Sequence, residues 1–207
     1  MAIVINGSGT VTGLAVGGLP DGTVDAGTLA TNSVDSAELI DGAVDDSHMA
    51  AMAASKLSGT VATARLPAGS VLQVVSSTAN RAAATTSTSY AATGVTASIT
   101  PSSTSSKILA TYHSGLCYQD HAVAWYGHFT IFRGSTNLGA ADGLSGMYIN
   151  TQSANDLGFN ASCEVLDSPS STSALTYTVQ WKTNNTNARM VHDLSGRSTI
   201  TLMEIAG

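Results

Sequence analysis

The chain has 207 residues, a formal net charge of −6 and only 11% charged residues. An acidic chain with few charges and no cluster of Lys and Arg lacks the electrostatic footprint of a nucleic-acid-binding protein, so we expect no nucleic-acid partner. The length is sufficient for one ordinary domain and an extension.

No segment shows the basic-then-apolar pattern of a signal peptide, and no run reaches the roughly eighteen apolar residues of a membrane-spanning helix. Cys117 and Cys163 are the only cysteines, which is too few for a disulfide framework. We therefore expect two buried free thiols in a protein that is assembled in the cytoplasm and does not insert into a membrane.

Residues 1–20 form an apolar and glycine-rich segment in which Asn6-Gly7, between apolar runs, predicts a hairpin. Gly17 and Gly18 belong to none of the glycine patterns of phosphate-binding loops. Glycines let a backbone lie close to another protein, and apolar side chains between them fill its grooves. The residues expected to dock in this way are Ile3, Ile5, Val11, Leu14, Val16 and Leu19.

Residues 21–69 consist of imperfect repeats, in which a valine or methionine is followed five residues later by leucine or methionine. Asp35 and Glu38 have the spacing of a helix capping box, so each unit is expected to be a short extended piece, one capped turn and a break. Two apolar residues in ten bury too little surface to order the others in a single copy. Several copies around a common axis would bury more, and three copies give a closed cyclic symmetry.

The repeats therefore predict an intertwined trimeric shaft. A disordered Ala/Ser/Thr linker is the alternative, against which the regular apolar spacing argues. The residues expected at the trimer axis are Val24, Leu29, Val34, Leu39, Val44, Met49, Leu57 and Leu66.

Residues 70–207 carry short runs of β-branched and aromatic residues, separated by turn residues such as Asp142-Gly143. The pattern has no helical period and predicts about eight to ten antiparallel strands in a β-sandwich of the jelly-roll type. The expected strands are 71–75, 90–99, 107–112, 123–133, 147–149, 157–165, 175–181, 189–191 and 198–205, with a loop or edge region at 76–89.

Side chains at alternate positions of a strand share one face of its sheet. Alternation places Ile108, Ala110 and Tyr112 on one face of their strand and assigns Tyr177, Val179 and Trp181 to the inward face of theirs. In the strand 123–133 it places Trp125, Gly127, Phe129 and Ile131 on one face and Tyr126, His128, Thr130 and Phe132 on the other. The last strand is apolar on both faces near its end, at Leu202, Met203 and Ile205. A strand of this kind favours burial on both sides, at an interface between subunits.

Histidine and cysteine spacing gives one candidate metal site, at His113, Cys117 and His121. Residues four apart align on a helix, but this segment is predicted as strand and turn, where such a group does not close into a tetrahedron. We expect no metal and no cofactor, although one histidine per chain around an ion on a threefold axis stays open.

Nucleophilic and acid–base motifs are incomplete. His192, Asp193 and Ser195 lie too close in sequence on a predicted strand to act as a relay. Gly143 to Gly146 is one residue shorter than the Gly-x-Ser-x-Gly motif. No spacing singles out a pair among the acids Asp120, Asp142, Asp156, Glu164, Asp167 and Asp193. We therefore expect no enzyme.

Three stretches carry a resemblance to a known family. They are residues 5–24, the Asn/Gly-x-Val-Asp-x-Ala-x-Leu repeats, and residues 69–75 with 99–101 and 106–109. In this order they resemble tail-fibre and related virion fibre proteins of tailed bacteriophages, over nearly the whole chain. The resemblance implies a mainly β homotrimer with a virion-attachment segment at 1–20, an intertwined repeat shaft at 21–69 and a C-terminal antiparallel β-sandwich knob, jelly-roll-like, at 70–207.

The resemblance also implies a structural virion protein whose partners are two further copies of itself and, through the N-terminus, other tail or capsid proteins. Its function would be adhesion of the knob to a host-surface glycan or protein. The alternative is a capsid decoration or cement protein, also called a head fibre, that stabilises the phage head. A depolymerase tailspike would require a carboxylate pair in a groove, and a soluble trimeric lectin would leave residues 1–20 without a docking partner.

Adhesion is expected from loops of the knob, where amides and an aromatic ring are available to sugars or to a surface protein. The same residues are also ordinary components of solvent-exposed turns. The candidate receptor contacts are Tyr118, Gln119, Asn150, Asn155, Asn184, Asn185 and Asn187.

Overall fold

The structure is a computed structural model that describes residues 4–5, 11–12, 59, 61–80, 83–119, 123–150, 157–193 and 196–207. Internal contacts divide the chain into two compact units, Met1–Thr60 and Val61–Gly207. The predicted boundary at residue 70 lies inside the second unit, which begins with the 3-10 helix η3 (Thr63–Arg65) and the half-buried Leu66.

In the first unit, β1 (Val4–Ile5) pairs antiparallel with β2 (Val11–Thr12), and Ile5 lies opposite Val11. The predicted hairpin is therefore confirmed. Most of the expected docking and shaft residues lie outside the described residues, namely Ile3, Leu14, Val16, Leu19, Val24, Leu29, Val34, Leu39, Val44, Met49 and Leu57.

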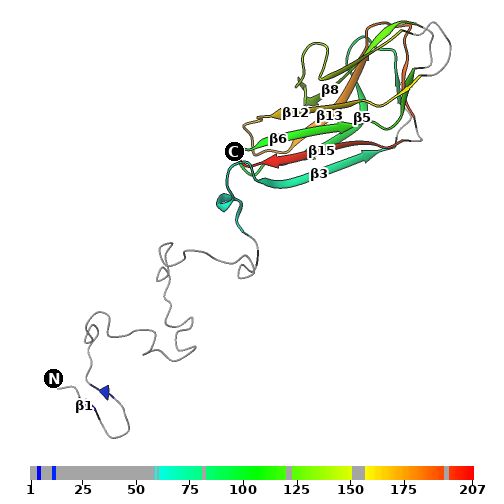
Figure 1. The fold of residues 1–207 in the computed structure, drawn as a ribbon. Coiled ribbons are helices and arrows are strands. Elements are labelled where there is room, and N and C mark those ends of the chain that lie inside the picture. Colours follow the sequence, from blue (N-terminus) through cyan, green and yellow to red (C-terminus); the bar gives the residue numbers. More distant parts are fainter. Residues whose placement is uncertain are drawn as a thin grey trace. The chain divides into compact units, whose positions relative to one another are not determined.

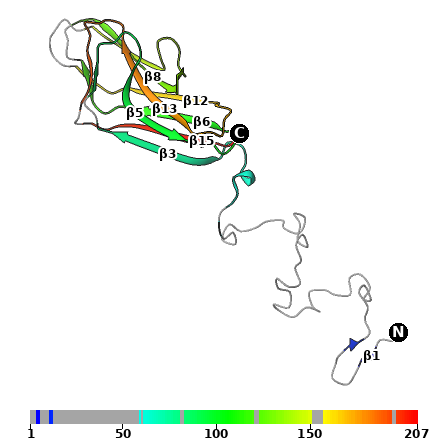
Figure 2. The ribbon, with the colours of Figure 1, turned by 180° about the vertical axis from the view of Figure 1, so that it is seen from behind.

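The second unit is built from antiparallel strands, and its described residues contain no α-helix. One sheet, here called the terminal sheet, has the order β12 (Ser162–Asp167), β6 (Lys107–His113), β15 (Ser198–Ile205) and β3 (Val71–Ala79). A second, the central sheet, has the order β10 (Ser145–Ile149), β8 (Trp125–Arg133), β13 (Leu175–Thr183) and β5 (Ala91–Ile99), with β9 (Thr136–Asn137) beside β8. Figure 1 and, from the opposite side, Figure 2 show β3, β15 and β6 side by side in one layer.

A further four-stranded sheet has the order β11 (Leu157–Phe159), β7 (Cys117–Gln119), β14 (Met190–His192) and β4 (Ala83–Thr85). Each of its strands adjoins in sequence the strand at the same place in the terminal sheet, so it continues that sheet beyond a break. At the break the backbones of Gly115 and Gly196 approach so closely that a Cβ at Gly115 would lie 2.5 Å from the Gly196 carbonyl carbon. Only glycine fits such an approach.

The terminal and central sheets pack face to face, with contacts of β5 to β3 and β15 and of β8 to β12. The predicted antiparallel β-sandwich is thus confirmed, and the residues predicted to face inward, Tyr177, Val179 and Trp181, are buried. The strand faces that carry Tyr112 and Phe129 also form the core. Each large side chain removed from water contributes about 1.5–3 kcal/mol. Within the described part of the chain, no helix has the length and hydropathy to span a membrane.

The polar stretch 76–89, predicted as a loop or edge region, supplies strand instead at 76–79 and at 83–85. Both strands do lie at the edge of their sheets. Ser76 and Thr78 face Thr201 and Thr199 of β15, with hydroxyl oxygens 3.2 and 3.3 Å apart. Cross-strand hydroxyl pairs stabilise a sheet without an apolar alternation, which explains why the sequence pattern missed this segment.

Candidate functional site

Two exposed tyrosines lie directly opposite each other on the outer face of the central sheet. Tyr126 of β8 pairs with Tyr148 of β10, and their ring centroids are 4.6 Å apart. His128 stacks on Tyr126 at 6.2 Å, with an interplanar angle of 13°. Tyr126 is 46% exposed and Tyr148 is 54% exposed. We call Tyr126, Tyr148 and His128 the tyrosine platform.

The alternation of β8 explains why the platform faces outward. Trp125, Gly127 and Phe129 fill the core, so the residues between them must point to solvent. The paired rings of Tyr126 and Tyr148 expose apolar surface to solvent, and each ring carries a hydroxyl group at its end. Such a surface suits a ligand with an apolar face and hydrogen-bonding groups around it.

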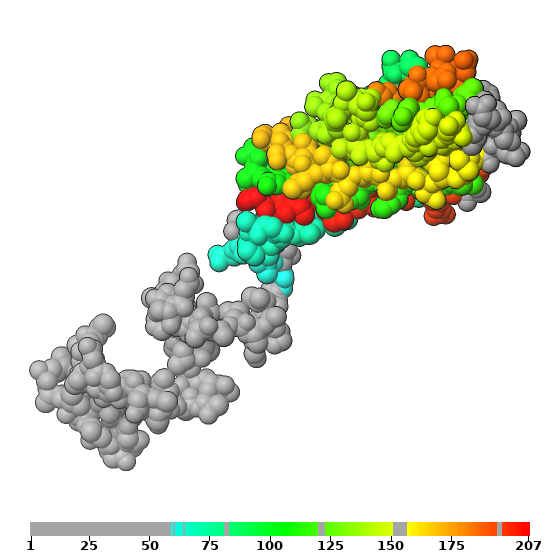
Figure 3. Space-filling model, turned by 45° about the horizontal axis from the view of Figure 1, so that its top comes forward, coloured from blue at the N-terminus to red at the C-terminus, as the bar shows by residue number. Residues whose placement is uncertain are grey.

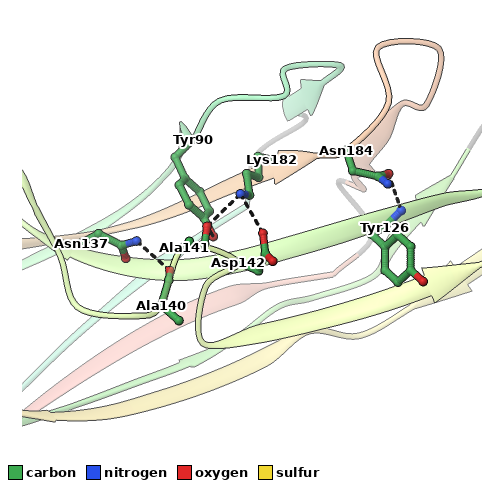
Figure 4. Close-up of polar contacts among 8 residues, drawn as sticks. All are labelled: Tyr90, Tyr126, Asn137, Ala140, Ala141, Asp142, Lys182 and Asn184. Atoms are coloured by element: carbon green, nitrogen blue, oxygen red, sulfur yellow. Dashed lines mark hydrogen bonds and ion pairs between the residues drawn. The ribbon is translucent and has the colours of Figure 1, made fainter.

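Asn184 adds an amide at one edge of the platform (Figure 4). The backbone N–H of Tyr126 donates to Asn184 Oδ1 at 2.7 Å, and the backbone N–H of Asn184 donates to the Tyr126 carbonyl at 3.1 Å. These reciprocal bonds fix the loop after β13 to β8. No described residue accepts a hydrogen bond from Asn184 Nδ2, which leaves that donor for a ligand.

Lys182 organises the other edge of the same face. Its Nζ donates to the Ala141 carbonyl at 2.8 Å, pairs with Asp142 at 3.2 Å and lies 4.8 Å from the centroid of the Tyr90 ring (Figure 4). The Tyr90 hydroxyl also donates to the Ala141 carbonyl, at 3.4 Å. Burial and, secondly, the Asp142 carboxylate raise the pKa of Tyr90 to about 12. Tyr90 is therefore neutral, and Lys182 positions the 138–143 loop.

Asn137 braces this loop from β9. Its Oδ1 accepts hydrogen bonds from the Thr130 hydroxyl at 2.6 Å and from the Gly139 N–H at 3.0 Å, and its Nδ2 donates to the Ala140 carbonyl at 3.1 Å (Figure 4). The predicted turn at Asp142-Gly143 is confirmed, because Gly143 N–H donates to the Ala140 carbonyl and Gly143 has φ +86°.

Gly143→Ala is expected to destabilise the second unit, Val61–Gly207, by about 2–3 kcal/mol. The new Cβ would lie 2.4 Å from the Phe129 carbonyl oxygen and would occupy a left-handed conformation. Gly134→Ala is the matched control, since Gly134 has φ +56° and nothing within 4 Å of the added atom. It should cost only about 1 kcal/mol. Urea denaturation of both variants separates the close approach from the backbone strain, and equal losses would contradict this account.

The five asparagines among the candidate receptor residues fall into three groups. Asn150 and Asn184 are exposed and follow directly after β10 and β13. Asn185 and Asn187 lie in the same loop as Asn184, where Asn185 Oδ1 accepts the Asn187 N–H at 2.9 Å, an ordinary turn contact. Asn155 lies outside the described residues.

Tyr118 and Gln119 are not in a loop, contrary to the prediction. Both belong to β7, which pairs with β11 on one side and β14 on the other. Gln119 is only 1% exposed, and its Nε2 donates to the Val123 carbonyl at 3.1 Å. Gln119 is thus not available at the surface of this chain, while Tyr118 is half-buried.

Sequence reasoning missed the platform itself. A signal for it was present, because Tyr126 and His128 share the face of the strongest predicted strand that lies opposite Trp125 and Phe129. Large rings on a face that the core does not use indicate a binding surface. Tyr148 and Lys182 gave no such signal. They lie beside Tyr126 and His128 only because β10 and β13 pair with β8.

The buried histidine and cysteines have environments that suit structural roles. His192 Nε2 lies 2.9 Å from the Tyr112 hydroxyl, and burial lowers the pKa of His192 to about 4. Burial likewise raises the pKa of the Cys117 thiol to about 11 and that of Cys163 to about 12. All three groups are neutral near pH 7, and the prediction of buried free thiols is confirmed.

The remaining chemical candidates form no metal-binding group among the described residues. His113 is exposed at the end of β6, whereas His121, Ser195, Asp120 and Asp156 lie outside the described residues. Among the described acids, Asp142 pairs with Lys182, Asp167 pairs with Arg133, and Glu164 is exposed on β12.

Comparison with known proteins does not assign this chain to a family. No family model matches the chain, and no curated protein matches it. A solved structure of infectious bursal disease virus, Gx strain, is similar with 11% sequence identity and a TM-score of 0.28, covering 72% of this chain and 42% of that one. The chain thus spans less than half of that relative, and a likeness at this level assigns neither fold nor function.

Proposed function

We propose that this chain is a structural fibre of a bacteriophage virion, and that its C-terminal knob adheres to the host surface through the tyrosine platform. The observation that supports adhesion is the exposed pair Tyr126 and Tyr148, with 4.6 Å between ring centroids and the amide of Asn184 beside it. The knob would be a jelly-roll-like sandwich, and the protein would be located in the virion.

A surface glycan is the ligand that this geometry fits best. A sugar ring presents an apolar C–H face, which packs on an aromatic ring, and hydroxyl groups around its rim. The two phenol hydroxyls, Asn184 Nδ2 and His128 can meet those hydroxyls. The platform is open to solvent and carries no unpaired cation, because Lys182 is held by Ala141 and Asp142. We therefore favour a neutral part of the glycan over an acidic group.

Weak single sites suffice if several act together. In the proposed arrangement residues 1–20 attach to other virion proteins, the repeats form a trimeric shaft, and three knobs present three platforms. Linked sites bind with an avidity about 10²–10⁴ times above the single-site affinity. The proposal requires no catalytic group and no cofactor.

Tyr148→Ala is expected to weaken binding of the purified full-length protein to host cells or to their isolated polysaccharide by about tenfold per site, because one stacking ring is worth about 1–1.5 kcal/mol. Tyr126→Ala should have a similar effect. Leu157→Ala is the matched control, since Leu157 is also a large exposed side chain (44%) but lies on β11, away from the central sheet. Its binding should not change.

Unchanged binding by both tyrosine variants would contradict adhesion through the platform. The capsid decoration alternative predicts a different result, in which particles that lack this protein adsorb normally but lose their DNA at lower temperature. Adsorption and heat inactivation of the same particles therefore distinguish the two functions.

A further inference from the structure

The outer face of the terminal sheet carries a row of apolar side chains that crosses all four strands. Leu166 of β12 lies opposite Leu109 of β6, Leu109 opposite Met203 of β15, and Met203 opposite Val74 of β3. Leu166 is 53% exposed and Val74 is 57% exposed, while Leu109 and Met203 are half-buried. These four residues form the apolar row.

The row lies toward the end of the sheet at which the chain enters this unit. Val71 and Ile205, which pair with each other, extend the apolar surface in that direction. Next to them, the Gly69 N–H donates to the Ala206 carbonyl and the Ala206 N–H to the Ser70 carbonyl, each at 2.8 Å. The segment that follows the repeats is therefore joined to the C-terminal end beside the row.

The rest of this face is almost uncharged. Beyond the row it presents Ser76, Thr78, Thr111, Thr199 and Thr201, several of which pair their hydroxyls across strands. Among the described positions this face carries one base, Lys107, one acid, Glu164, and the exposed His113 at its far end, whereas the whole chain has a net charge of −6. Copies of an acidic chain can meet here with few like charges between them, which favours association with the same chain.

We propose that the apolar row packs against another copy of this chain, so that the knobs associate through the outer faces of their terminal sheets. This inference rests on the proposed homotrimeric fibre and names the surface by which its knobs meet. The entry of the chain at this end supports it, because a shaft of several copies would bring identical rows together. The arrangement also leaves the tyrosine platform, on the opposite sheet, facing outward. Figure 3 shows the red atoms of β15 at the surface beside the cyan atoms of β3.

Cysteine labelling of the full-length protein tests this interface. Val74→Cys and Tyr148→Cys introduce thiols at positions of nearly equal exposure in one copy, 57% and 54%, on opposite outer faces. The native Cys117 and Cys163 are buried and should react slowly. We expect a maleimide to label Val74→Cys at least tenfold more slowly than Tyr148→Cys, and light scattering to give the molar mass of an oligomer.

A second substitution identifies the face responsible for the protection. Met203→Glu, added to Val74→Cys, should raise the labelling rate at least fivefold, because a charge would enter the contact between rows. Thr178→Glu on β13 of the central sheet is the control and should leave the rate unchanged. Equal labelling of Val74→Cys and Tyr148→Cys, protection in a monomer, or no effect of Met203→Glu would each overturn the inference. None of these readouts depends on glycan binding, so failure of adhesion would be seen separately.

Discussion

Replacing Asp167 with alanine is expected to lower the free energy of unfolding of the second unit, Val61–Gly207, by about 3–5 kcal/mol. Asp167 is buried on β12, where both carboxylate oxygens accept hydrogen bonds from Arg133 Nη1, at 2.8 and 2.6 Å. The Tyr177 hydroxyl donates to the same carboxylate at 2.7 Å. Arg133 and Tyr177 belong to the central sheet and Asp167 to the terminal sheet, so this cluster ties the two layers together.

The expected loss of stability is large because alanine at position 167 would leave Arg133 and Tyr177 without their partner. Arg133 is only 24% exposed, so its charge would remain partly buried without a partner, and the Tyr177 hydroxyl would lose its acceptor. Burial and then the Asp167 carboxylate raise the pKa of Tyr177 well above its usual value, which keeps the hydroxyl protonated as the donor. Urea denaturation followed by the fluorescence of the buried Trp125 and Trp181 measures the loss.

Asp142→Ala is the matched control, since it removes an aspartate from the other ion pair of the described residues. Asp142 is 78% exposed where it meets Lys182, and exposed pairs contribute about 0–1 kcal/mol. A similar loss in both variants would show that burial does not determine the strength of the Asp167 cluster.

The alternation of residues along single strands was sufficient to predict part of the core of the sandwich. Tyr177, Val179 and Trp181 alternate along one strand, and this local information fixed their inward orientation before any partner strand was known. This pattern does not predict a strand whose sequence lacks an alternation of apolar and polar residues. Gln119 looks like a loop residue next to polar neighbours, yet it lies in β7, which pairs with a strand on each side, and its side chain is on the buried face.

The candidate site was less accessible to sequence reasoning because it depends on register. Tyr126 and Tyr148 are far apart in the sequence, and a shift of one residue between β8 and β10 would turn one of them into the core. The ion pair of Arg133 with Asp167 is equally non-local, since it joins strands of different sheets. The three amides of the Asn184–Asn187 loop were found because a cluster of asparagines marks a turn in any fold.

Replacing Glu204 with alanine is expected to cost about 4 kcal/mol, because it leaves several buried donors without an acceptor. Glu204 is fully buried near the end of β15. Its Oε1 accepts the backbone N–H of Ser102 at 2.6 Å and the hydroxyls of Ser102 and Ser106 at 2.7 Å each, and its Oε2 accepts Gln73 Nε2 at 2.6 Å. The carboxylate therefore holds the 100–106 loop and β3 to the C-terminal strand, beside the end of the sheet where the apolar row lies.

The same contacts predict a dependence on pH. Burial raises the pKa of Glu204, but the hydrogen bonds from Gln73, Ser102 and Ser106 outweigh it, and the net pKa lies below the usual value of 4.5. Between the two values the unfolded chain binds more protons than the folded one. The stabilisation is thus complete above about pH 4.5 and is lost as the pH falls through the lowered pKa of the folded state.

Glu204→Gln should keep the shape of the side chain but remove this titration. We expect its free energy of unfolding to lie below that of the wild type at pH 7, and the difference to shrink as the pH is lowered below about 4.5. Glu164→Gln is the control, because Glu164 is exposed on β12 and should leave both stability and its pH dependence unchanged. A constant difference between wild type and Glu204→Gln across this range would contradict this account, because it would mean that folding does not change the pKa of Glu204.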